Sequence, residues 1–132
     1  MTNIRAFISG IVLPSILLPL ILSVAVYLER PQLSEVLFVH YLPIIWGVWN
    51  IIYFAGLRES LPGSQDVKLM LTGLILGLLV AIVAVFFVDL PEAMGLEGNA
   101  VYIPLVLGPI LYAILWWLVV NPLNKIVGVE NR

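Results

Sequence analysis

Four long apolar runs without any Asp, Glu, Lys or Arg constrain this chain more than any other feature of its sequence. They occupy about residues 6–28, 36–57, 69–88 and 100–120. Each is close to the ~20 residues that a helix needs to cross ~30 Å of hydrocarbon, and none alternates as a membrane β-strand does. Because lipid cannot satisfy backbone polar groups, such runs predict helices. We therefore predict an all-α integral membrane protein with four transmembrane helices.

The connections between these runs are short and contain helix-breaking residues. They read "ERPQLSE", "RESLPGSQDVK" and "DLPEAMGLEGN", and none is long enough to hold a soluble domain. Short connections make successive helices antiparallel neighbours. The sequence thus predicts a single domain over residues 1–132, built as an up-down-up-down bundle.

The distribution of basic residues predicts the orientation of the bundle. The side with the N-terminus, the second connection and the C-terminus carries Arg5, Arg58, Lys68, Lys125 and Arg132, whereas the other side carries only Arg30. Cytoplasmic connections are enriched in Lys and Arg. We expect both termini in the cytoplasm and the protein in an inner (plasma) membrane of bacterial type.

Charge and composition exclude several classes of function. Charged residues make up 11% of the chain, far below the roughly 25% of soluble domains, and the net charge is −2. A chain without an excess of basic residues is not expected to bind nucleic acid. With one His and no Cys, no metal site and no cofactor is predicted. Without a charge inside the spans or a nucleophile–base set, neither ion-coupled transport nor an enzyme is expected.

The polar and aromatic residues of the second run form the candidate ligand site. His40, Gly47 and Asn50 share one helical face, and Trp46 and Tyr53 lie on a neighbouring face. Polar groups within a span are expected to face the interior of the bundle. We predict that polar and aromatic residues of the second run bind a ligand together with one residue of the fourth run. The set comprises His40, Trp46, Asn50, Tyr53 and Tyr112. The alternative is that Asn50 bonds a neighbouring helix and His40 is an interface residue.

The third run carries a ridge of small residues. Gly73, Gly77, Ala81 and Ala84 recur in "TGLILGLLVAIVA" at spacings that place them on one helical face. In membranes such residues let two helix backbones approach closely. The ridge predicts helix packing, either within the bundle or against another subunit.

Prolines interrupt three of the runs, and further polar residues lie near the ends of the first and last. Each proline removes a backbone hydrogen bond and favours a kink. We predict kinks at Pro14, Pro19, Pro43, Pro104 and Pro109. We also expect Asn121–Pro122 to end the fourth helix, and Ser9 to bond a carbonyl of its own helix.

Two functions fit these features. In the first, the bundle or its oligomer binds or passes a small neutral or apolar molecule or lipid at an intramembrane site. In the second, the protein is an accessory or assembly subunit that acts through helix–helix contacts. Both functions predict membrane lipids as neighbours, together with a homo-oligomer or a larger membrane complex.

Overall fold

The computed structural model describes residues 1–129 as helices joined by short turns, with no strand in that range. Four helical stretches are long and apolar enough to span a membrane: Thr2–Tyr27, Leu37–Ser60, Gln65–Phe86 and Gly98–Ile126. They coincide with the four apolar runs, and all four extend past the run at the end nearest the termini. The prediction of an all-helical protein with four candidate membrane spans is confirmed.

Two of the four spans are single helices and two are interrupted. The first span is α1 (Thr2–Tyr27) and the third is α5 (Gln65–Phe86). The second comprises α3 (Leu37–Ile52), the segment η1 (Tyr53–Leu57), which is kinked at Gly56, and α4 (Arg58–Ser60). The fourth comprises the 3-10 helix η2 (Gly98–Tyr102), α7 (Pro104–Leu115), the π-helical segment η3 (Trp116–Val120) and α8 (Asn121–Ile126). Two short helices, α2 (Gln32–Glu35) and α6 (Leu90–Ala93), lie in the connections.

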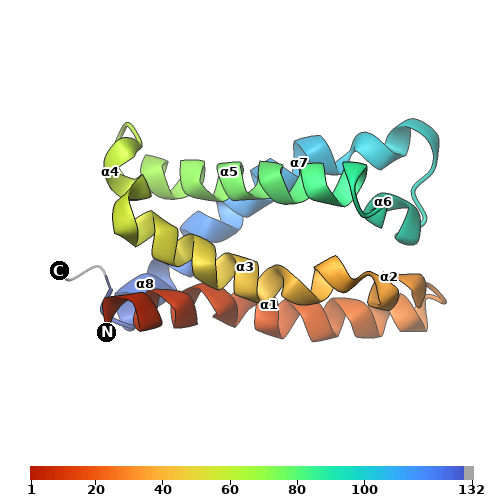
Figure 1. Ribbon diagram of the computed structural model, residues 1–132, viewed down its shortest axis with the longest axis horizontal. Helices are drawn as coiled ribbons and strands as arrows, with labels where there is room; N and C mark the ends of the chain where they lie inside the picture. Colours follow the sequence, from red (N-terminus) through yellow and green to blue (C-terminus); the bar gives the residue numbers. More distant parts are fainter. Residues whose placement is uncertain (130–132) are drawn as a thin grey trace.

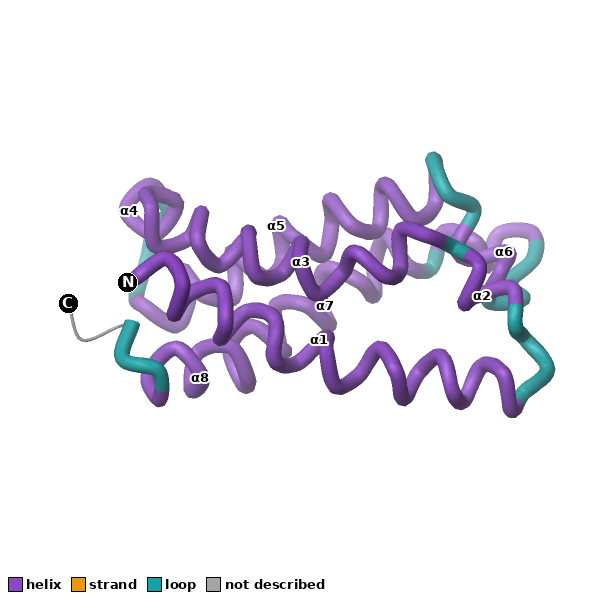
Figure 2. The backbone as a smooth tube through the Cα atoms, turned by 60° about the horizontal axis from the view of Figure 1, so that its bottom comes forward, coloured by secondary structure: helices purple, strands orange, loops and turns teal. Residues whose placement is uncertain are grey.

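The long helices alternate in direction and form two hairpins (Figure 1). One hairpin pairs α1 with α3, and the other pairs α5 with α7. The N-terminus, α4 and α8 lie at one end of the bundle, which we call the terminal end. The short helices α2 and α6 lie at the other, the loop end. The fourth span pairs with α5 through α7 and then crosses to the first hairpin, so that α8 contacts α1 near the N-terminus (Figure 2).

Glycines set the close approach of the helices within each hairpin. A Cβ atom added at Gly10 of α1 would lie 2.7 Å from the carbonyl oxygen of Trp46 and 2.9 Å from the Cα atom of Gly47. A Cβ atom at Gly77 of α5 would lie 2.8 Å from the Cα atom of Pro109. Since real Cβ atoms do not come this close to a backbone, each hairpin depends on glycine at its contact.

The main apolar core lies in the terminal half of the bundle and joins the two hairpins. It consists of Trp46, Tyr53, Leu69, Leu76, Trp116 and Val120. These residues come from the second, third and fourth spans, and all are at least nine-tenths buried. A smaller cluster of Ala25, Leu33 and Val39 lies at the loop end, within the first hairpin and α2.

Two prolines of the fourth span behave differently from what the sequence predicts. Pro104 is the first residue of α7, where its missing N–H would be unbonded in any case, so it begins a helix and does not kink one. Pro122 does not end the span, because it lies in the first turn of α8, which starts anew after the π-helical segment and continues to Ile126. The other predicted prolines, Pro14, Pro19, Pro43 and Pro109, lie inside continuous α-helical segments.

Candidate functional site

Two adjoining apolar cavities lie between the hairpins, and we call them together the interhairpin groove. The larger, about 580 Å³, has walls from α3, α5, α6 and the fourth span. The smaller, about 150 Å³, has walls from α1, α3 and α7. Leu42, Leu111 and Tyr112 line both cavities, so the two are adjacent. The larger is within the range of ~300–1,000 Å³ that is typical of small-molecule sites.

The groove exists because the two hairpins meet in the terminal half and diverge toward the loop end. Gly10 and Gly47 hold α1 to α3, while Gly73 and Gly77 hold α5 to the fourth span. Neither pair holds one hairpin to the other. At the loop end α2 contacts α6, whose Leu90 and Pro91 line the groove. The long walls of the groove are therefore helices, and it lies between the apolar core and the α2–α6 contact.

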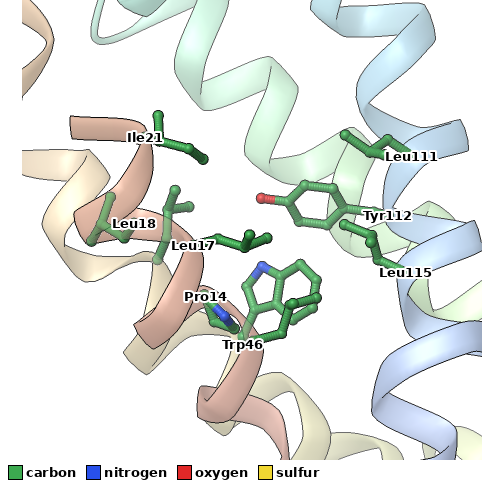
Figure 3. A pocket seen from close by; sticks show the side chains of 10 residues that line it. Pro14, Leu17, Leu18, Ile21, Trp46, Leu111, Tyr112 and Leu115 are labelled. Atoms are coloured by element: carbon green, nitrogen blue, oxygen red, sulfur yellow. The ribbon is translucent and has the colours of Figure 1, made fainter. Parts of the chain in front are cut away.

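Tyr112 and Trp46 supply the polar atoms of the groove lining. The phenol of Tyr112 extends from α7 across the smaller cavity, with its hydroxyl toward Leu17 and Ile21 of α1 (Figure 3). The Trp46 ring lies beside it, with centroids 4.9 Å apart, and the centroids of Trp46 and Trp116 are 5.1 Å apart. Trp46 thus forms the boundary between the groove and the apolar core.

Asn50 lies away from the groove, in a buried polar cluster with Ser9 and Asn124. Its Nδ2 atom is 2.7 Å from the carbonyl oxygen of Ala6, 2.9 Å from Ser9 Oγ and 2.8 Å from Asn124 Oδ1. Ser9 Oγ is 2.6 Å from the same Asn124 oxygen. All three side chains are fully buried. This cluster joins α1, α3 and α8, which is the role that the packing alternative assigned to Asn50.

The remaining predicted ligand residues of the second span do not line the groove. His40 is exposed near the loop end, and its Nε2 atom is 2.8 Å from the carbonyl oxygen of Ser34. Tyr53 is fully buried in the core, and its hydroxyl accepts a hydrogen bond from Gln65 Nε2 at 3.0 Å. Of the five predicted ligand residues, the structure brings together Trp46 and Tyr112.

The small-residue ridge of the third span packs inside the bundle. Cβ atoms added at Gly73 and Gly77 would meet the side-chain Cβ atoms of Trp116 and Tyr112, both at 2.7 Å. Gly77, Ala81 and Ala84 also line the groove. The ridge therefore contacts the fourth span and also forms part of the groove wall.

Ser9 and Asn124 are the cluster residues that the sequence analysis missed. Ser9 was assigned to a carbonyl of its own helix, and it does lie 3.0 Å from the Ala6 oxygen, but it also reaches Asn124. The only available signal was the pair of asparagines in "NPLNK". These asparagines indicate the cluster only if the fourth helix is extended past Pro122.

A separate polar cavity of about 430 Å³ lies at the terminal end, lined by Thr2, Phe54, Arg58, Glu59, Lys68 and Val129. The apolar core lies between this cavity and the groove.

Two buried polar atoms near the core, Trp116 Nε1 and Asn121 Oδ1, have no hydrogen-bond partner among residues 1–129. Over the same residues, no group of three or more His, Cys, Asp or Glu is placed to hold a metal ion.

No protein-family model matches this chain, and neither a curated protein nor a solved structure shows significant similarity to it.

Proposed function

We propose that this protein is a multi-pass membrane protein that binds the hydrocarbon chain of a lipid in the interhairpin groove, without enzymatic chemistry. The larger cavity carries the proposal: it holds about 580 Å³, and Tyr112 is the only one of its lining residues with a polar side-chain atom. In keeping with the distribution of Lys and Arg, we place the terminal end on the cytoplasmic side.

The surrounding solvent supports a hydrocarbon chain as the occupant. Within a membrane the groove is next to lipid tails, which are as apolar as its walls. An empty groove would leave those walls without van der Waals partners on one side, whereas water would find only Tyr112 and Trp46 for hydrogen bonding. A lipid tail restores the contacts and leaves no polar group unpaired.

The buried side chains beyond the groove favour binding over passage. Trp46, Tyr53 and Trp116 are at most 3% exposed and fill the path toward the terminal end. The polar cluster of Asn50, Ser9 and Asn124 is as tightly buried. A permeating molecule would have to displace these aromatic side chains. The proposal is therefore a binding site that ends at Trp46.

The accessory-subunit function loses one argument. It relied on the Gly73–Gly77 ridge as a surface for a partner, but those positions are occupied by α7. A partner helix would have to use another face or enter the groove itself, which makes a bound helix a distinct outcome of the test.

The test is to fill the groove and measure the lipid that remains bound. Val80 lines the larger cavity, whereas Val106 of α7 is 64% exposed and outside it. We expect wild type and Val106→Phe, purified in mild detergent, to retain about one lipid per chain by native mass spectrometry. Val80→Phe should lose most of it because the larger ring occupies the space of the tail.

Circular dichroism and thermal unfolding of the delipidated proteins separate loss of lipid from loss of fold. Lipid retention by a folded Val80→Phe variant equal to that of wild type would refute the proposal. A lipid-free dimer in the wild-type spectrum would refute it as well, by indicating that a second copy fills the groove.

A further inference from the structure

The loop-end rim of the groove contains an arginine whose charge is not used by the fold. Arg30 is exposed and follows the end of α1 by three residues. Among the Lys and Arg side chains of residues 1–129, it alone lies at the loop end. No carboxylate in that range forms an ion pair with it.

The position of this guanidinium is set by a glycine in the connection after α6. A Cβ atom added at Gly95 would lie 2.5 Å from Arg30 Cζ and 2.8 Å from Arg30 Nη2. Gly95 also has a φ of +83°, a conformation that other residues rarely adopt. The guanidinium therefore rests against backbone that only glycine leaves free.

The residues on either side of Gly95 line the groove. Met94 and Leu96 are both part of the wall of the larger cavity, as is Pro91 of α6. The Arg30 charge is thus one residue away from the groove wall, at the end where α2 and α6 meet. A molecule in the groove that extends toward the loop end would bring its end group next to Arg30.

The depth of this rim matches the headgroup region of a bilayer. The 26 residues of α1 make a helix of about 39 Å, longer than the ~30 Å of the hydrocarbon layer. Arg30 lies beyond the end of that helix. A lipid with its tail along α7 and α5 would therefore have its phosphate near this guanidinium.

We infer that the groove selects a glycerophospholipid, with an acyl chain between the hairpins and the headgroup phosphate on Arg30. This inference depends on the proposed function, because it names the lipid class of the same site. Arginine suits the role because its planar guanidinium can donate two parallel hydrogen bonds to phosphate oxygens. Hydrocarbon alone gives no selectivity in a membrane, since every tail is equally apolar. The phosphate contact supplies it.

The experiment compares two lipids with the same oleoyl chains, dioleoyl phosphatidylethanolamine and dioleoylglycerol, which lacks the phosphate. Delipidated protein is titrated with each in detergent, and bound lipid is counted by native mass spectrometry. We expect wild type and Arg5→Gln, a control at the terminal end, to bind the phospholipid about tenfold more tightly than dioleoylglycerol. Arg30→Gln should bind both lipids equally, at the affinity that wild type has for dioleoylglycerol.

The outcomes distinguish the two proposals. If Arg30→Gln keeps the wild-type preference while Val80→Phe blocks both lipids, the inference about Arg30 is refuted and the groove site stands. If wild type binds the two lipids equally, the inference is refuted in the same way. If Val80→Phe binds both lipids as wild type does, the groove itself is refuted. We expect inorganic phosphate not to displace the bound phospholipid. Displacement by phosphate at millimolar concentration would refute an Arg30 contact that requires the headgroup to be anchored by its acyl chain.

Discussion

The terminal half of the bundle and its loop-end half join the same two hairpins by different means. In the terminal half Asn50, Ser9 and Asn124 bond across three helices, and Trp49 Nε1 donates to the Thr72 carbonyl at 3.0 Å. In the loop-end half the hairpins are separated by an apolar cavity of about 580 Å³. Polar contacts and aromatic packing make the terminal half a junction between the hairpins. The loop-end half contains the interhairpin groove.

The largest expected difference between the halves comes from one substitution made in each. Gly10→Ala puts a methyl group 2.7 Å from the Trp46 carbonyl oxygen, and we expect a loss of roughly 1–3 kcal/mol in unfolding free energy. Gly108→Ala has 3.4 Å to the Ala81 Cβ atom, so it should be neutral or stabilise by up to about 1 kcal/mol. Unfolding in mixed detergent micelles measures both. Equal losses would show that the two halves are packed alike.

A second comparison uses two polar residues of the same helix. Asn50→Leu removes the centre of the buried cluster and leaves Ser9 and Asn124 with fewer partners, which should lower the unfolding free energy by about 1–2 kcal/mol. His40→Leu removes one exposed contact and should cost less than about 1 kcal/mol. Lipid retention should be unchanged in both. A folded Asn50→Leu protein that had lost its lipid would return Asn50 to the ligand site.

The smallest effect concerns the bond between the second and third spans. Trp49→Phe keeps most of the aromatic packing but removes the donor to the Thr72 carbonyl, so we expect a loss of about 0.5–1 kcal/mol. Trp117→Phe is the matched control, since that side chain is 37% exposed. The same micelle unfolding assay applies. An equal change in the two variants would mean that this bond adds nothing to the junction.

The candidate site was predictable only in part, and the reason can be seen in the second span. Helical periodicity placed His40 and Asn50 on one face, but that face turns from exposed at His40 to buried at Asn50. The change follows from the crossing of the helices: the hairpins meet beside Asn50 and have diverged at His40. Periodicity describes one helix and contains no information on where its neighbours lie.

The four helices can be predicted from length and the absence of charge, because a 20-residue apolar run has no other structure in lipid. Gly73 and Gly77 can likewise be predicted as contact positions, since glycine has no side chain to separate two backbones. The folded bundle is needed to show which helix they contact, that Asn124 completes the Asn50 cluster, and that a groove remains between the hairpins. Those outcomes depend on the crossing of the fourth span, which is set by many weak packing contacts between residues distant in sequence.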